Sequence, residues 1–431
     1  MGPLEELHRT DPDYITYVPE SVDTRHAENQ HFIVIATPAD TFLAIWTQSS
    51  SEADPDQRVV SARSTDEGQT WTDPIEIAGP GPTDAGMGIA SWGFPIVAPD
   101  IPESGRHRIY CFYNKNVGID DSRGDTTGEM RCRFSDDDGR SWSDREIQYD
   151  IKSAAISHPK PDVPESWIVY QQPTVLADGS VLAPYTHWAS NQFDVDLDGS
   201  AMFDRHSEVR FLRFEDIREE PDPASLTVTT WPHGEHGLQV PHPDRPGISV
   251  VQEPAARYLP DGRLLCAMRT LQGELYFALS EDDGRTWDTP RPLCYGPESE
   301  AQPLENPISP APIYSLPNDR ILLVFYNNDG TGHGGTGPQN TRVNRTPAWY
   351  TIGEYVDHPS HPISFDPPRI LLDNDRIPYG PNDRTEVATY PSFFVYDDTP
   401  YFWYPDRKHF LLGKELTAKL DRYGSENPDC H

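Results

Sequence analysis

Residues that could do chemistry stand at recurring places in this sequence, at the ends of short apolar runs. The residues that precede six such runs are Gln30, His31, Trp92, Gln171, Gln172, Glu253, Ser309 and Tyr390. Those that follow the paired run are Trp46, Asn114, His187, Arg269, Asn327, Asn328, Asp406 and Arg407. If these ends meet, polar and aromatic side chains line one pocket, which suits a sugar. A histidine among them could transfer protons, because its pKa lies near neutrality.

The elements that would position these residues are six predicted β-hairpins. Each consists of an apolar run, a turn rich in Pro, Asp or Gly, and a second apolar run, as in Tyr258-Leu-Pro-Asp-Gly-Arg-Leu-Leu265. The hairpins span Phe32–Trp46, Phe94–Tyr113, Thr174–Tyr185, Ala255–Met268, Ala311–Tyr326 and Ser392–Tyr404. We interpret each as the inner half of a four-stranded blade. A blade cannot bury its faces alone, so the units are expected to close into a ring.

An octapeptide of the pattern S-x-D-x-G-x-[ST]-W occurs three times, at residues 64–71, 135–142 and 280–287. Its Ser and Asp can bond the backbone of a turn, its Gly can adopt positive φ, and its Trp can pack underneath. Asp66 and Asp137 lie 71 residues apart, and Asp282 follows Asp137 after 145. A degenerate copy is therefore expected near residue 209, and a period of about 72 gives six units. We predict an all-β, six-bladed β-propeller, with seven blades as the alternative, forming a single domain over residues 1–431.

The octapeptides resemble the Asp-box, or BNR repeat, of the sialidase/neuraminidase-like superfamily. In that family the boxes are structural, and the pocket lies at the ends of the inner strands. The segment Glu253–Arg269 resembles the one that runs from the glutamate beside the nucleophile to the second substrate arginine. Tyr390, in Thr389-Tyr-Pro-Ser392, resembles the nucleophilic tyrosine, and Arg342 or Arg345 resembles the third arginine. The resemblance implies that Tyr390 and Glu253 are catalytic and that the arginines bind a sugar carboxylate.

The sequence departs from the family at two places. Gln30-His31 stands where the first arginine is expected, and Trp92-Gly-Phe-Pro95 stands where the acid/base aspartate is expected. We therefore hypothesise that His187 or His31 replaces the aspartate. The remaining substrate-binding positions would be Gln30, Trp92 and Gln172.

The leading functional hypothesis is an exo-acting, sialidase-like glycoside hydrolase that removes a terminal, acidic sugar. One alternative is a polysaccharide lyase or rhamnosidase-type propeller enzyme that acts at a uronate linkage. In that case the arginines would acidify the C5 proton, while Tyr390 and His187 or His31 would exchange protons. The other alternative is a glycan-binding propeller whose catalytic groups have decayed, although the intact Glu253, Arg269 and Tyr390 count against it.

Composition limits partners and cofactors. A net charge of −34 argues against nucleic acid or an anionic membrane as partner. The resemblance to sialidases implies a carbohydrate ligand, one that carries an acidic group. The five cysteines form no CxxC motif, so neither a zinc site nor a disulfide framework is expected. No cofactor is expected, although the alternating Asp194, Asp196 and Asp198 could hold a structural calcium ion. The first 17 residues lack the features of a signal peptide, which predicts a cytoplasmic location, or secretion if a leader once preceded them.

Overall fold

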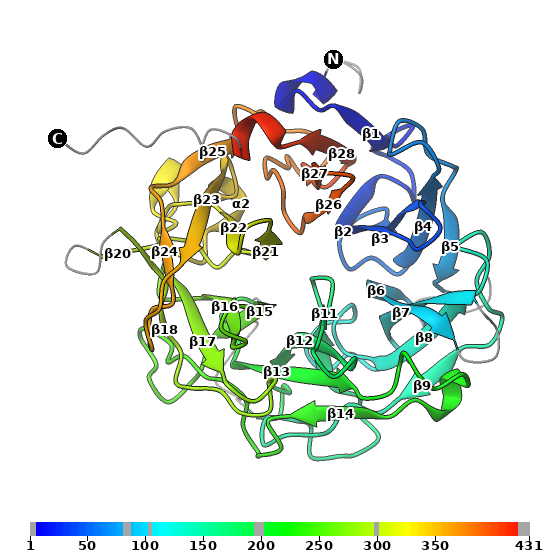
Figure 1. Ribbon diagram of the computed structural model, residues 1–431, viewed down its shortest axis with the longest axis horizontal. Coiled ribbons are helices and arrows are strands. Elements are labelled where there is room, and N and C mark those ends of the chain that lie inside the picture. The colour runs from blue at the N-terminus through cyan, green and yellow to red at the C-terminus, as the bar shows by residue number, and fades with distance from the viewer. Residues whose placement is uncertain (1–5, 81–87, 102–105, 194–201, 297–300, 421–431) are drawn as a thin grey trace.

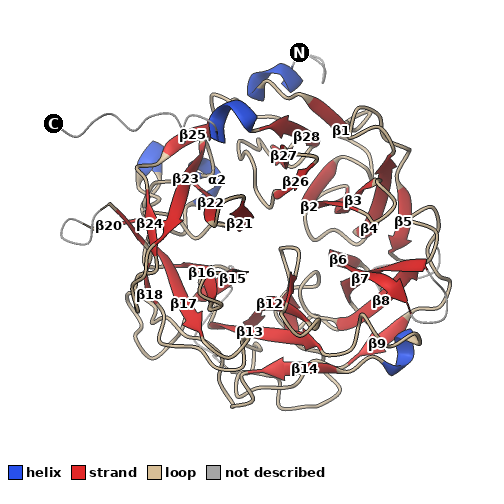
Figure 2. Ribbon diagram, viewed as in Figure 1, coloured by secondary structure: helices blue, strands red, loops and turns tan. Residues whose placement is uncertain are grey.

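The computed structural model describes residues 6–80, 88–101, 106–193, 202–296 and 301–420. Its strands form sheets that follow one another around a ring, from the blue N-terminal segments to the red C-terminal ones (Figure 1). Within the described residues, helix is confined to short segments such as α2 (Thr341–Asn344), as Figure 2 shows. The prediction of an all-β propeller is confirmed.

Four of the sheets have four antiparallel strands each. Their strand orders are β2-β3-β4-β5, β6-β7-β8-β9, β15-β16-β17-β18 and β1-β28-β27-β26. The first two contain β2 (Glu28–Ala36), β3 (Phe42–Ser49), β4 (Arg58–Ser64), β5 (Ile75–Ala78), β6 (Ala90–Ile101), β7 (Arg106–Lys115), β8 (Glu129–Ser135) and β9 (Ile147–Tyr149). The other two contain β15 (Val251–Tyr258), β16 (Leu264–Thr270), β17 (Leu275–Ser280), β18 (Arg291–Pro292), β1 (Tyr14–Tyr17), β26 (Ser392–Tyr396), β27 (Thr399–Asp406) and β28 (Phe410–Glu415).

We predicted six four-stranded blades, with seven blades as the alternative. The two remaining sheets contradict this pattern, because they have five and seven strands. One has five strands, because two separate strands, β10 and β11, pair with different parts of β12. It contains β10 (Ser166–Ile168), β11 (Thr174–Val175), β12 (Val181–Trp188), β13 (Ser207–Phe214) and β14 (Val228–Trp231). The break falls at Gln171-Gln172-Pro173, where proline cannot donate a ladder hydrogen bond.

The other irregular sheet has seven strands. Two strands, β24 and β25, pair with opposite ends of β23, and the hairpin β19–β20 extends the sheet through a parallel pairing with β24. It contains β19 (Cys294–Tyr295), β20 (Gln302–Pro303), β21 (Ile313–Leu316), β22 (Arg320–Phe325), β23 (Ala348–Tyr355), β24 (Ile363–Phe365) and β25 (Arg369–Leu372). Neither irregular sheet carries an octapeptide.

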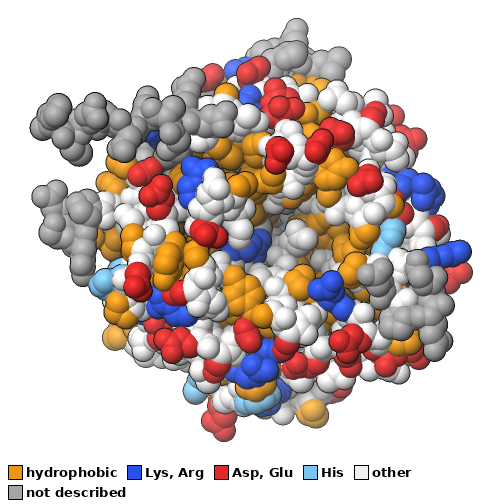
Figure 3. Space-filling view, viewed as in Figure 1, with side chains coloured by type: hydrophobic (Ala, Val, Ile, Leu, Met, Phe, Trp, Pro, Cys, Tyr) orange, Lys and Arg blue, Asp and Glu red, His pale blue; other side chains and the backbone are white. Residues whose placement is uncertain are grey.

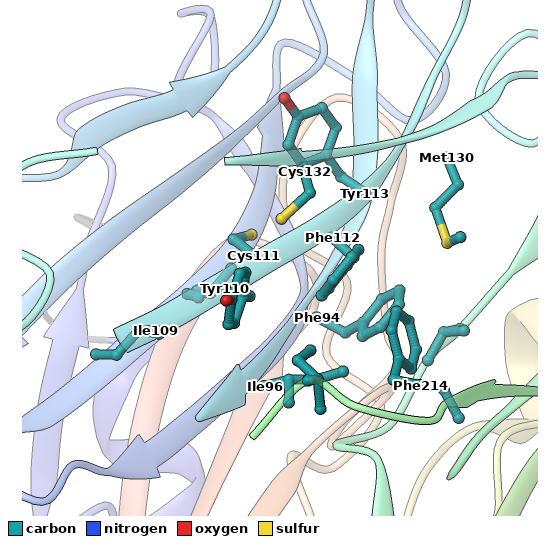
Figure 4. Close-up of a cluster of buried hydrophobic side chains, with 14 of the residues drawn as sticks. Phe94, Ile96, Ile109, Tyr110, Cys111, Phe112, Tyr113, Met130, Cys132 and Phe214 are labelled. Carbon is teal, nitrogen blue, oxygen red and sulfur yellow. The ribbon is translucent and has the colours of Figure 1, made fainter. Parts of the chain in front are cut away.

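The core lies between neighbouring sheets, because both faces of most inner strands are buried. Figure 4 shows one such cluster, in which Phe214 of β13 packs on residues of β6 and β7. Its ring centroid lies 4.6 Å from that of Phe112 and 6.4 Å from that of Phe94. Apolar residues along the length of these strands therefore pack between adjacent sheets. Polar residues can then occupy the ends of the strands.

The octapeptides form turns that satisfy their own polar groups. Asp66 illustrates this: one carboxylate oxygen accepts a hydrogen bond from the Thr70 backbone N–H at 2.9 Å and the other from the Thr70 hydroxyl at 2.6 Å. The Ser64 hydroxyl donates to Asp66 at 2.7 Å and accepts from the Gly68 N–H at 2.8 Å. The same set of bonds recurs around Asp137 and Asp282.

Each octapeptide also packs on the preceding sheet of the ring. A Cβ on Gly68, whose φ is +87°, would lie 2.5 Å from the Trp403 ring, so only glycine fits there. Trp287 stacks on Phe211 of β13, with ring centroids 4.4 Å apart. The tryptophan was predicted to lie beneath its turn, and Trp71 and Trp287 do contact their own turns, because each indole N–H donates to the turn glycine's carbonyl at 3.0 Å. All three indoles are half-buried, and that of Trp142 donates to Ser61 of the preceding sheet instead.

The face of the ring shown in Figure 3 is hollowed around the axis. No helix among the described segments is long and apolar enough to cross a membrane.

Candidate active site

A pocket of about 460 Å³ lies where the ends of several sheets meet, a size that suits a single sugar unit. One wall is apolar and contains Trp92, Ile168, Trp188, Met202 and Phe203. The rest is rich in charge, with Glu52, Arg123, Glu253, Arg269, Arg342, Arg345, Arg384, Glu386, Tyr390 and Lys408. Six of the ten predicted site residues line it: Tyr390, Glu253, Arg269, Arg342, Arg345 and Trp92.

Tyr390 and Glu253, which are 137 positions apart in the sequence, are joined by a buried hydrogen bond. The phenol donates to Glu253 Oε1 at 2.7 Å. Arg269 Nη1 lies 2.6 Å from the other carboxylate oxygen, and Arg269 Nη2 donates to Gln252 Oε1 at 2.7 Å. Burial, reinforced by the negative Glu253, raises the pKa of Tyr390 well above its usual value. The phenol therefore keeps its proton in the free protein and has a carboxylate in place to accept it.

Arg345 is held in the pocket without a carboxylate. Its Nε donates to Ser309 Oγ at 2.9 Å and its Nη2 donates to the Ile308 carbonyl at 3.3 Å. Among the described residues, no carboxylate lies within ion-pair distance of its guanidinium. Arg342 Nη2 donates to the Asn382 carbonyl at 2.8 Å, and its guanidinium has no ion-pair partner in the described part of the chain. These cations are therefore available to bind an anionic ligand.

Three residues that line the pocket and the adjacent His31 share an unusual backbone conformation. His31, Trp92, Glu253 and Tyr390 all have positive φ, between 48° and 63°, and none is glycine. Three of them lie at register shifts near the starts of β2, β6 and β15. Such bulges re-aim side chains and cost free energy, and they cluster at functional sites.

Threonines of the preceding sheet stabilise two of these bulges. The Trp92 N–H donates to Thr47 Oγ1 at 3.0 Å, and the Glu253 N–H donates to Thr186 Oγ1 at 2.6 Å. Both threonines come from the second strand of the preceding sheet, β3 or β12. The ring thus fixes the strand entrances from the side, and the pocket is built by neighbouring sheets together.

Comparison with known proteins places the chain in a family. A model of the BNR repeat-like domain matches residues 40–401. The chain belongs to the BNR repeat-like domain family. This confirms the resemblance to the sialidase-like superfamily.

Solved structures of the same fold include several sialidases. The Hadza microbial sialidase Hz136 is 15% identical, with a TM-score of 0.57 over 92% of this chain and 68% of that one. Trypanosoma rangeli sialidase in complex with sialic acid is 12% identical, with a TM-score of 0.55 over 96% of this chain and 59% of that one. A Dyadobacter fermentans protein of unknown function is 14% identical, with a TM-score of 0.57 over 94% of this chain and 97% of that one. At these identities the likeness establishes the fold. No curated protein sequence matches the chain.

The two histidines lie outside the pocket lining of this BNR repeat-like chain. His187 is fully buried, and its Nε2 is 2.8 Å from Glu165 Oε2. His31 is buried between Trp92 and Tyr390, with ring centroids 5.1 and 6.4 Å away. Burial lowers the pKa of His31 to about 3, so this imidazole is neutral at physiological pH.

Two predicted substrate-binding glutamines also lie away from the pocket. Gln30 is buried beside His31, and Gln172 lines a separate groove together with Arg257 and Tyr314. Among the described residues no cluster of His, Cys, Asp or Glu could hold a metal ion. The possible calcium ligands Asp194, Asp196 and Asp198 lie outside the described residues.

Five charged residues of the BNR repeat-like pocket were missed from the sequence: Glu52, Arg123, Arg384, Glu386 and Lys408. They come from connections rather than from inner-strand entrances. A usable signal existed for Lys408, because the chain has only six lysines and this one directly follows Asp406-Arg407 at the end of an inner hairpin. Glu52 lies in the connection that follows the first hairpin.

Proposed function

We propose that the protein is an exo-acting glycosidase of the sialidase-like type that removes a terminal acidic sugar. The observation that carries the proposal is the hydrogen-bonded pair Tyr390–Glu253, with Arg269 beside it and the unpaired Arg345 in the same pocket. The apolar wall would receive the less polar face of the ring. The sialidase neighbours, one of them with sialic acid bound, support the class of substrate.

In the proposed reaction Tyr390 is the nucleophile. Its oxygen forms a bond to the anomeric carbon while its proton passes to Glu253 and the glycosidic C–O bond breaks. The buried phenol resists ionisation in the free protein, so the transfer to Glu253 must accompany the attack. Arg345 and Arg269 would hold the sugar carboxylate and fix the ring over the tyrosine.

The departing oxygen needs a proton donor. We propose Glu52 for this role in place of a histidine, because Glu52 lines the pocket whereas neither His31 nor His187 does. A quarter of its side chain is exposed, whereas Glu386, the other pocket carboxylate besides Glu253, is buried. After the first step Glu52 would take a proton from water, whose oxygen displaces Tyr390 from the sugar while Glu253 returns the phenolic proton.

The test is a panel of terminal acidic glycosides, with uronates beside sialosides. We expect saturated reducing sugar from a uronate and little turnover of simple sialosides, because the family's first arginine is replaced by Gln30-His31. Ultraviolet absorbance of unsaturated uronate is measured in parallel. Its appearance would identify a lyase and overturn the hydrolase proposal, and efficient cleavage of a sialoside would overturn the substrate preference.

A further inference from the structure

Three cations of the pocket converge on one carboxylate, that of Glu52. Lys408 Nζ lies 2.6 Å and Arg384 Nη2 3.2 Å from Glu52 Oε2, while Arg123 Nη1 lies 3.7 Å from Oε1. The three come from different connections of the ring. All four residues line the pocket.

The two arginines have further anionic partners, whereas Lys408 has none besides Glu52 among the residues that the structure describes. Arg384 lies 2.8 Å from Glu28 and 3.3 Å from Glu386, and Arg123 pairs with Asp125. Within the described part of the chain, Glu52 is the only carboxylate within ion-pair distance of Lys408, whose side chain is only 2% exposed. If Glu52 leaves, a buried ammonium loses its counter-ion, which is costly unless another anion takes its place.

Glu52 is the most exposed of the carboxylates that pair with these three cations. Its side chain is 25% exposed, compared with 1% for Glu28, 4% for Glu386 and 0% for Asp125. Glu52 is therefore the carboxylate of this cluster with the most room to turn toward solvent.

We propose that Lys408, Arg384 and Arg123 form an anion subsite, separate from Arg345 and Arg269, in which Glu52 is the resident counter-ion and is replaced by a carboxylate or sulfate group of the ligand. The inference rests on the proposed function only in taking that ligand to be an acidic sugar. It gives the pocket a second position for negative charge. It also explains why a chain with a net charge of −34 gathers six cations around one pocket.

Displacement would change the protonation of Glu52. Although burial opposes ionisation, Lys408, Arg123 and Arg384 hold the pKa of Glu52 well below its usual value. Once released from them, with Glu28, Glu386 and Asp125 still nearby, the carboxyl regains a higher pKa and takes up a proton in mildly acidic solution. Ligand binding would thereby turn Glu52 into the proton donor that the reaction needs.

The experiment is calorimetric titration of the full chain with inorganic sulfate at pH 5 and pH 8, in buffers of different ionisation enthalpy. Sulfate stays ionised at both, so proton uptake reports on the protein. We expect uptake at pH 5 and none at pH 8. Glu52→Gln should abolish the proton uptake and tighten sulfate binding several-fold. Lys408→Met should weaken sulfate binding about tenfold. Lys160→Met, at an exposed lysine, is the matched control.

A parallel titration with d-glucuronate determines which anionic group the subsite prefers, and uptake that depends on Glu52 with either anion supports the proposal. Binding without such uptake, unchanged binding by Lys408→Met, or no binding of either anion would overturn it. If Lys408→Met does not fold, the Glu52→Gln titration still decides. The proposed function is tested separately, since a Tyr390→Phe protein should lose turnover and keep the Glu52-dependent uptake.

Discussion

The octapeptide turns and the strand entrances both contain residues with positive φ, but the polar groups of the two regions differ in how completely they are hydrogen-bonded. In the turns both oxygens of Asp66 are bonded within the same eight residues. At the entrances, Trp92 Nε1 and both ring nitrogens of His31 are buried with no hydrogen-bond partner among the described residues. The entrances also place bulky residues at positive φ.

The difference separates structural from functional sites in this ring. A turn that satisfies its own polar groups has nothing left for a ligand and contributes to stability. A strained entrance with unsatisfied polar groups costs stability and is maintained only where the surrounding sheets enforce it. Changes in the turns should therefore reduce stability, and changes at the entrances should reduce activity.

The largest effect is expected for Tyr390→Phe. Removal of the hydroxyl should lower kcat at least about 10³-fold, because the nucleophile is lost while the ring still packs. Steady-state kinetics on the best acidic glycoside measure this, and thermal unfolding should show an almost unchanged Tm. Retained activity would remove Tyr390 from the mechanism.

Arg269→Met should lower kcat/KM, with a loss of roughly 2–4 kcal/mol of transition-state stabilisation. The variant leaves Glu253 buried without its cation and removes a group that would bind the carboxylate of the sugar. The matched control is Arg342→Met, which removes a pocket cation that has no carboxylate partner among the described residues. Equal losses in both variants would show that the Glu253 contact has no special role.

Trp287→Ala tests the turn side of the comparison. The indole stacks on Phe211 but is only half-buried, so we expect about 2 kcal/mol of lost stability, less than the roughly 3–5 kcal/mol of a fully buried tryptophan. Chemical denaturation measures the loss, and turnover by the folded fraction should be unchanged. Normal stability with lost activity would mean that the structural and functional regions have been exchanged.

The smallest effect concerns acid stability at an entrance. The folded pKa of His31, about 3, lies below the unfolded value, so its contribution is complete above about pH 6.5 and is lost as the pH falls toward 3. Between pH 6.5 and pH 5.5 the wild type should lose about 1 kcal/mol of stability relative to His31→Phe. Denaturation curves at several pH values provide the test, and parallel profiles would contradict the assigned protonation.

The sequence was informative where the signal is local. The octapeptides and hairpins indicated a propeller, and the convergence of hairpin ends brought Tyr390, Glu253 and Arg269 together in advance. His187 was expected on the pocket wall, but side chains alternate along β12: Thr186 reaches the Glu253 backbone and His187 faces Glu165. One position along a strand decides this, and periodicity alone does not fix it.

The missed features depend on contacts between distant segments. Arg384, Lys408 and Arg123 reach Glu52 from connections whose paths are set by tertiary packing, and no local pattern marks the two arginines. The uneven sheets have a similar origin. The inner strand is broken at Gln172-Pro173, and the hairpin β19–β20 is added to another sheet. The three octapeptides, from which the repeat was inferred, lie in other sheets and give no sign of these irregularities.

The pairing of β1 with β28 also governs how the protein can fold. Tyr14 donates a hydrogen bond to Glu415, 401 residues away, and the first strand completes the sheet made by the last three. Contacts of such sequence separation form late, because the entropy of closing the loop must be overcome first. During synthesis the segment Tyr14–Tyr17 therefore stays unpaired until Phe410–Glu415 has left the ribosome. Until β1 and β28 pair, β28 has one edge with unpaired backbone groups.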